Sequence, residues 1–217
     1  MKTARIILIC LSLMFLVSVA AATTVPNYMF TIQQTQKWYK SEGFGKVAAM
    51  RLHTRINGSF NGAVILERET WLNSDVIAAD RLLFSKDIDG NIHFHGDLDN
   101  YVLDDPILWV DAPLSVGKTW TDCRPEIPGN TDPENMIHYV FAVLDTRDIQ
   151  CPAGVFACHR VFLSVLFPDG HTENEAYWYN PNCGMVMCTR TNQRTFELQK
   201  AIIPGVGEYP DVECDFP

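Results

Sequence analysis

Three alternating runs in the C-terminal half decide the fold: Ile137–Ile149 (IHYVFAVLDTRDI), Val155–Phe167 (VFACHRVFLSVLF) and Glu173–Tyr179 (ENEAYWY). Turn residues separate them, with Pro152-Ala153-Gly154 after the first run and Pro168-Asp169-Gly170 after the second. Apolar residues alternate with polar ones, which is the period of a half-buried strand. Because such short connections cannot carry a crossover, these runs are expected to pair as antiparallel neighbours.

The same pattern continues toward the N-terminus. Residues 47–56 and 63–71 flank Asn57–Gly62, which predicts a hairpin loop. Residues 76–85 and 92–98 flank a second turn, in which Asp89-Gly90 suits a tight reversal of the chain.

Further strands are expected at Tyr101–Val110, around Trp120, at residues 185–190 and at residues 195–203, and the tail from about Pro204 is expected to be extended. Residues 28–39 are compatible with a short helix or an opening strand. The sequence therefore predicts an all-β domain, a single antiparallel meander of about ten strands. A sheet of that length curls, so a half-barrel, a roll and a sandwich all remain open.

The N-terminus has the three parts of a secretory signal peptide. Lys2 and Arg5 precede the apolar run Ile6–Val19, and small residues follow at Ala20-Ala21-Ala22. The apolar run is shorter than the about 20 residues of a membrane span. We expect residues 1–22 to be a signal peptide, residues 23–217 to form one β domain outside the cytoplasm, and no transmembrane segment to remain after cleavage.

The charge balance bears on partners. The chain has 26 acidic and 17 basic side chains, a formal charge of -9. Binding to nucleic-acid phosphates requires a basic face, so nucleic acid is not expected as a partner.

Six cysteines follow the predicted signal peptide, an even number that predicts up to three disulfides in an oxidising compartment: Cys123, Cys151, Cys158, Cys183, Cys188 and Cys214. A tight turn at residues 167–171 would place Cys158 near residues 181–183, which makes a Cys158–Cys183 disulfide geometrically reasonable. The remaining pairings stay open. No C-x-x-C occurs, so a zinc site built from these cysteines is not favoured.

Three motifs resemble a family of secreted bacterial proteins of unknown function, the TapB-like family. They are Pro113–Trp120 (PLSVGKTW), Pro152–Phe156 (PAGVF) and Trp178–Val186 (WYNPNCGMV). The resemblance covers about residues 83–200. It implies an extracytoplasmic β domain and brings no catalytic residue, cofactor or ligand with it.

The residues of these motifs suit turns and a core. Gly117 and Gly154 stand where a turn favours positive φ, and Trp120, Phe156 and Trp178 are large enough to anchor a core. The alternative for Trp178 or for Tyr179, its neighbour, is stacking against a ligand.

His93 and His95 are the candidate metal ligands. They are two residues apart on a predicted strand, so both imidazoles are expected on its solvent-exposed face, with Asp97 next to them. No further ligand is evident. The segment Asp87–Asn91 lacks the glycine and glutamate spacing of a calcium loop and is expected to be a turn.

No catalytic constellation is evident. The chain has no G-x-S-x-G motif, and Glu173 and Glu175, which share one strand face, are expected to lie in solvent. The sequence favours a non-catalytic exported domain that binds a small apolar ligand or an envelope protein, without a cofactor. The alternative is an extracytoplasmic metal-dependent enzyme or metal binder that uses His93 and His95.

Overall fold

Nearly every described residue of the chain lies in an antiparallel strand or in a short turn between two strands. The computed structural model describes residues 28, 35–43, 46–72, 75–126, 130, 132–191, 194–205 and 207–209. The strands are β1 (Gln36–Gly43), β2 (Lys46–Phe60), β3 (Ala63–Leu72), β4 (Asp75–Lys86), β5 (Ile92–Asp97), β6 (Tyr101–Val110), β7 (Thr119–Pro125), β8 (Met136–Cys151), β9 (Gly154–Leu166), β10 (Thr172–Asn180), β11 (Gly184–Thr189), β12 (Thr195–Ile203) and β13 (Gly207–Tyr209). Within these ranges no helix is long and apolar enough to cross a membrane.

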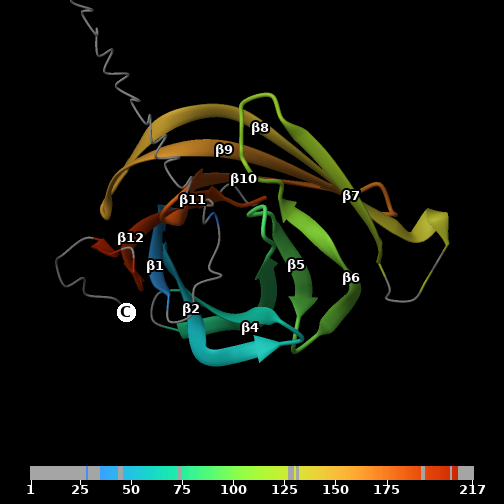
Figure 1. The fold of residues 1–217 in the computed structure, drawn as a ribbon, viewed down its shortest axis with the longest axis horizontal. Helices are drawn as coiled ribbons and strands as arrows, with labels where there is room; N and C mark the ends of the chain where they lie inside the picture. The colour runs from blue at the N-terminus through green and yellow to red at the C-terminus, as the bar shows by residue number, and fades with distance from the viewer. Residues whose placement is uncertain are drawn as a thin grey trace, which may run out of the picture.

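The strands form a nearly closed antiparallel barrel (Figure 1). Neighbours in the chain pair from β1 to β6 and again from β7 to β12, and β1 pairs with β12 to join the two series. This junction runs from Gln36 opposite Ile202 to Lys40 opposite Glu197. The expected antiparallel meander is confirmed, and of the three open architectures the structure comes nearest to the curled barrel.

The ring has a seam between β6 and β7, where the described residues form no backbone ladder. Side chains of β7 bind the backbone of β6 instead. Asp122 accepts a hydrogen bond from the N–H of Leu108 at 2.9 Å, and Arg124 donates from Nη2 to the carbonyl of Pro106 at 2.7 Å. These bonds satisfy edge groups that would otherwise be open to another strand.

The hairpin of β2 and β3 turns more tightly than expected. Strand β2 runs to Phe60, and the reversal takes only Asn61 and Gly62, with φ of 49° and 84°. Two consecutive residues with positive φ suit the right-handed twist of a hairpin, and Asn-Gly is the favoured pair. The expected loop over residues 57–62 was therefore too long, although the hairpin itself is confirmed.

Residues 28–39 were compatible with a short helix or an opening strand, and the structure shows a strand, since β1 begins at Gln36. Residues 29–34 of that segment lie outside the described residues. The C-terminal hairpins are close to expectation: Tyr179 lies opposite His159 and Trp178 opposite Arg160, one residue from the predicted register. The tail adds the short strand β13 against β12.

A connected group of aromatic rings packs inside the barrel beside the seam. Trp120 stacks on Phe141 with ring centroids 5.0 Å apart and planes 5° apart. Trp109 contacts Phe94, Phe141 and Tyr177 at centroid distances of 5.6, 5.7 and 5.9 Å. The expected core role is confirmed for Trp120, and Phe156 and Trp178 are buried as well.

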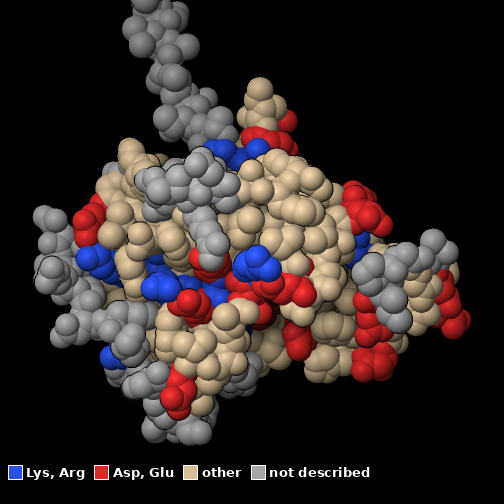
Figure 2. Space-filling model, turned by 90° about the horizontal axis from the view of Figure 1, so that it is seen from below, with Lys and Arg blue, Asp and Glu red and all other residues tan. Residues whose placement is uncertain are grey.

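The outer surface of β2–β4 is charged with both signs interspersed. Figure 2 shows Lys and Arg side chains beside Asp and Glu side chains on the face that lies below in Figure 1. Across β2 and β3, Arg51 binds Glu69 at 2.6 Å, and Arg81 of β4 binds Asp99 in the turn after β5. Exposed pairs of this kind contribute little to the stability of the fold.

Candidate ligand-binding cavity

An apolar cavity of about 230 Å³ lies inside the barrel. We call it the inner cavity. Most of its wall is aliphatic, aromatic or thioether, and the charged side chains among its described lining residues are two acids and two arginines. The lining residues are Met50, Leu52, Leu66, Arg68, Leu82, Phe84, Phe94, Asp97, Tyr101, Trp109, Glu175, Tyr177, Tyr179, Met185 and Arg190.

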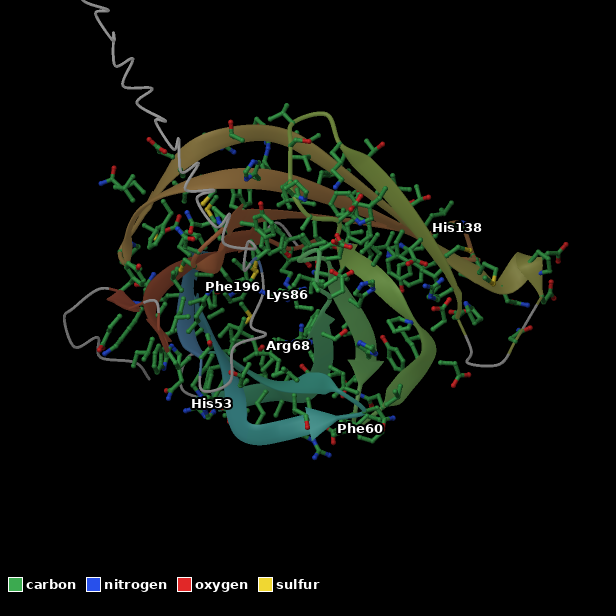
Figure 3. All side chains as sticks on the ribbon, in the orientation of Figure 1. His53, Phe60, Arg68, Lys86, His138 and Phe196 are labelled. Carbon is green, nitrogen blue, oxygen red and sulfur yellow. The ribbon has the colours of Figure 1, made fainter. Side chains whose placement is uncertain are left out.

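A second hollow of about 410 Å³ adjoins the inner cavity, because Met50, Arg68 and Arg190 line both. We call it the arginine chamber. Its lining is Ala48, Met50, Arg68, Thr70, Leu72, Ile77, Arg190, Arg194 and Phe196. Figure 3 places Arg68 and Phe196 on the inner side of the ring, whereas His138 lies toward its outer side.

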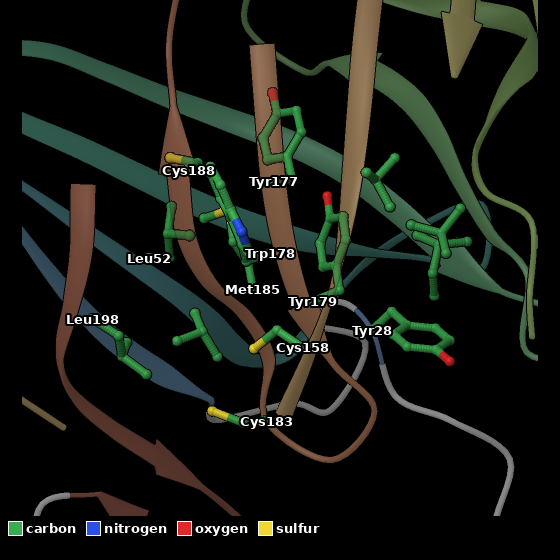
Figure 4. Packing of buried hydrophobic residues seen from close by; sticks show 14 of the residues in the cluster. Tyr28, Leu52, Cys158, Tyr177, Trp178, Tyr179, Cys183, Met185, Cys188 and Leu198 are labelled. Atoms are coloured by element: carbon green, nitrogen blue, oxygen red, sulfur yellow. The ribbon is translucent and has the colours of Figure 1, made fainter. Parts of the chain in front are cut away.

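Strand alternation explains how β10 supplies the inner cavity. Glu175, Tyr177 and Tyr179 are two residues apart and therefore face the same side of the strand. Tyr177 and Tyr179 stack with ring centroids 5.8 Å apart, and Figure 4 shows them side by side. The Tyr179 hydroxyl accepts a hydrogen bond from the indole N–H of Trp109 at 3.2 Å, so the two rings fix each other's position.

A polar cluster of Glu175, Tyr177 and Arg190 interrupts this apolar wall. Arg190 Nη1 lies 3.0 Å from one carboxylate oxygen of Glu175, and the Tyr177 hydroxyl donates to the other. Burial raises the pKa of Tyr177 well above 10, so the phenol keeps its proton and remains a donor. Arg190 keeps its positive charge, because a guanidinium is not deprotonated in proteins.

Arg68, the second shared arginine, binds an acid on the neighbouring strand. Its Nε and Nη2 lie 2.9 and 2.8 Å from the same oxygen of Asp80. Arg68 and Asp80 are directly opposite each other in the ladder of β3 and β4, so strand register places this pair. The charged side chains in the wall are thus held in place by partners.

The expectation that Glu175 lies in solvent was wrong. Its side chain is 14% exposed, and it takes part in the cluster with Arg190. Period-two alternation places Glu173 and Glu175 on one face, but it does not say which face lies inside the barrel. Glu173, closer to the strand end, pairs with His171 and is 43% exposed.

Asp97 faces the inner cavity, although it was expected on the solvent-exposed face of its strand. It is 7% exposed, and it lines the inner cavity, as Phe94 does. Residues 94 and 97 share a side because residue 95 is an extra residue of β5: consecutive residues of β4 lie opposite Phe94 and Gly96, and the β5–β6 register shifts there as well. A bulge of this kind breaks the alternation by one residue. The Asp97 carboxylate caps the following turn by accepting from the N–H of Asp99 at 2.9 Å.

His93 and His95 bind separate partners. His93 Nε2 lies 3.2 Å from the carboxylate of Asp87, and His95 Nε2 lies 2.7 Å from the hydroxyl of Ser85. The pKa of His95 is lowered by burial and then by the neighbouring His93. Within the described ranges no group of three His, Cys, Asp or Glu side chains could hold a metal ion. The geometry thus lends no support to a metal site at these histidines.

The Ser85–His95 pair was not found by sequence reasoning. A hydroxyl within 2.7 Å of an imidazole is the arrangement of a nucleophile and its base. Neither residue lines the inner cavity or the arginine chamber. The turn before β5 is as expected, since Asp87 accepts hydrogen bonds from the N–H groups of Asp89 and Asn91.

The cysteines do not support the expected disulfides. Cys123, Cys151, Cys158, Cys183 and Cys188 are all free thiols, and Cys214 lies outside the described residues. The Cys158–Cys183 expectation came from the hairpin register, and Cys158 lies one residue beyond the last pair of the β9–β10 ladder, Tyr179 opposite His159. Cys183 lies beyond that ladder, in the turn between β10 and β11. Figure 4 shows the two thiols near each other, with Cys188 farther away.

The two sides of β10 separate the two aromatic candidates for ligand stacking. Tyr179 lines the inner cavity. Trp178 faces the opposite side, where the guanidinium of Arg147 lies 5.5 Å from its ring centroid. Only Tyr179 of the two is thus placed to contact a molecule inside the barrel.

No family model matches the chain, and no curated protein matches it. Two solved structures are similar in shape. A Bacteroides fragilis protein described as exported and YmcC-like in fold is 16% identical, with a TM-score of 0.45; the match covers 82% of this chain and 99% of that one. A Parabacteroides distasonis protein described as a lipoprotein is 15% identical, with a TM-score of 0.40 and the same coverage.

Both TM-scores lie below 0.5. The resemblance to the TapB-like family stays a prediction.

Proposed function

We propose that this protein is an extracytoplasmic, non-catalytic binding protein that holds a small, largely apolar ligand inside its barrel. The inner cavity carries the proposal. Small-molecule sites are concave, mostly apolar and supplied with a few placed polar groups, and the inner cavity has this composition. The signal-like segment at residues 1–22 supports a location outside the cytoplasm.

The size of the cavity suits a small ligand. An apolar cavity of about 150 Å³ binds benzene, and the inner cavity has about 230 Å³ before the adjoining chamber is counted.

The wall of the cavity is also preorganised. Trp109 packs on Phe94 and Phe141 and donates its indole N–H to Tyr179, so its ring is held from several sides. A site whose side chains are fixed before binding loses less conformational entropy when the ligand arrives. The metal-dependent alternative has no comparable support, because His93 and His95 bind different partners.

A titration with N-phenyl-1-naphthylamine, a neutral dye that fluoresces in apolar surroundings, tests the proposal. We expect saturable enhancement with the wild-type protein and its loss in Leu82→Trp, which fills the inner cavity from its wall. Val155→Trp is the matched control, because Val155 is 67% exposed on β9. Absence of enhancement with the folded wild type, or equal enhancement in Leu82→Trp, contradicts the proposal.

A further inference from the structure

The described charged residues of the arginine chamber are positive, whereas the chain as a whole is acidic. The protein has more acidic than basic residues, 26 against 17. Among the described residues, the charged ones that line the chamber are nevertheless all arginines, namely Arg68, Arg190 and Arg194. The other described lining residues are apolar except Thr70. A hollow with apolar walls and three guanidinium groups suits a ligand that is apolar at one end and anionic at the other.

The carboxylates that bind Arg68 and Arg190 occupy only part of the hydrogen-bonding capacity of these two side chains. Arg190 binds Glu175 through Nη1, and Arg68 binds Asp80 through Nε and Nη2. A guanidinium carries five N–H donors, so each retains further donors after pairing with one acid. Arginine is the side chain best suited to carboxylate and phosphate, since its planar fork matches two oxygens at once.

Position links this charge to the proposed ligand site. Arg68 and Arg190 line both hollows, so they stand where the apolar cavity ends and the chamber begins. This inference rests on the proposed function. We propose that the ligand is a single-chain amphipathic anion, with its apolar chain in the inner cavity and its carboxylate or phosphate headgroup among Arg68, Arg190 and Arg194.

Four decyl compounds test the headgroup in displacement of N-phenyl-1-naphthylamine: decanoate, decyl phosphate, decan-1-ol and decylammonium. Losing a charge-assisted hydrogen bond of this kind lowers affinity about tenfold, so we expect decanol to bind about tenfold more weakly than the two anions. Decylammonium is expected to bind weakest. Acetate and inorganic phosphate, which lack the chain, are expected not to displace the dye; if they do so as well as the decyl anions, the site binds the free anion and the inference is wrong.

The failures of the two proposals are distinguishable. If decanol binds as tightly as decanoate, the cavity takes an apolar ligand and only the anionic headgroup is refuted. If none of the four compounds binds to folded protein, the proposed function itself is refuted.

Two variants are expected to change the affinity for an anionic ligand in opposite directions. Arg194→Gln is expected to weaken decanoate about tenfold and leave decanol unchanged, because one cation of the chamber is removed. Glu175→Gln is expected to strengthen decanoate, because the carboxylate that competes for Arg190 is removed. Arg81→Gln is the matched control, since Arg81 pairs with Asp99 at the surface. Equal losses of decanoate and decanol affinity in Arg194→Gln overturn the inference.

Discussion

The indole N–H of Trp120 on β7 donates to the backbone carbonyl of Leu108 on β6 at 2.9 Å. The two strands are neighbours in the chain and in space, and a side chain makes a bond that a backbone ladder makes elsewhere in the barrel. Trp120 also stacks on Phe141, so its ring is held while its edge binds the opposite strand. The seam of the barrel is therefore closed by side chains whose replacement can be tested one at a time.

Trp120→Phe is expected to lower the free energy of unfolding by about 1–2 kcal/mol, because the carbonyl of Leu108 loses a donor and some ring area is lost. The phenyl ring retains the stack on Phe141, so the fold is expected to persist. Denaturant unfolding followed by circular dichroism measures the change.

Trp178→Phe is the matched control for this substitution. Trp178 is also buried, at 6% exposure, but its indole N–H finds no acceptor among the described residues. Removing a buried donor that lacks an acceptor relieves a cost and offsets the lost ring area. A loss of stability in Trp178→Phe as large as in Trp120→Phe would mean that the seam bond contributes nothing.

Gly96→Ala is expected to destabilise the protein by about 3 kcal/mol, since strained backbone of this kind costs 1–3 kcal/mol and a clash adds to it. Gly96 has a φ of +104°, and an added Cβ would lie 2.4 Å from the carbonyl oxygen of Tyr101. Because this glycine lies in the bulge that turns Asp97 inward, the substitution is also expected to weaken dye binding.

Gly117→Ala tests the cost of the backbone conformation without the steric clash of an added Cβ. Gly117 has a similar φ of +87°, but an added Cβ would meet no atom within 4 Å. Its cost is expected to be about 1 kcal/mol, the penalty of the left-handed backbone alone. Thermal unfolding of both variants checks the order, and equal costs would show that the contact with Tyr101 is relieved by a small shift.

Local hairpins are the part of the fold that the sequence predicts best. The β9–β10 register follows from the turn at residues 167–171 to within one residue, because turn geometry and alternation act over a few residues. The β1–β12 pairing joins residues far apart in the chain, such as Gln36 and Ile202, and no local pattern encodes it. The closure of the barrel therefore could not be predicted from the sequence pattern.

The candidate site was missed for the same reason. Alternation places Glu175 with Tyr177 and Tyr179 on one face of β10, but ring closure decides that this face is the interior. The prediction placed Asp97 on the wrong face because a bulge at Gly96 shifts the alternation. A single glycine in a strand is not enough to predict a bulge. A polar residue in register with two buried aromatic residues is the signal that could have identified Glu175.

Alkaline pH is expected to destabilise the protein through its buried thiols. Burial raises the pKa of Cys188 from 9.0 to about 11 and that of Cys158 to about 12. Above pH 9 the unfolded chain loses these protons while the folded chain keeps them, so unfolding becomes more favourable as pH rises. This contribution to stability is complete below pH 9 and is lost as pH rises through the folded values, at up to about 1.4 kcal/mol per pH unit for each thiol.

Cys188→Ala is expected to reduce that slope between pH 9 and 11 when unfolding is measured under reducing conditions. Val186→Ala is the control, because Val186 is equally buried on β11 and carries no titrating group. The control is expected to lower stability at every pH without altering the slope. If both variants give the slope of the wild type, Cys188 keeps its proton no better in the folded chain than in the unfolded one.

The thiols also decide between the disulfides expected from sequence and the free cysteines of the structure. Cys123 is half-buried, whereas Cys151, Cys158, Cys183 and Cys188 are buried. With free thiols, maleimide is expected to label Cys123 first in the native protein and the other four only after denaturation, because thiolate fraction and access set the rate. Peptide mapping by mass spectrometry, without any reductant during purification, measures the order. If Cys158 and Cys183 stay unlabelled in denaturant until a reductant is added, the two form a disulfide and the arrangement of free thiols is wrong.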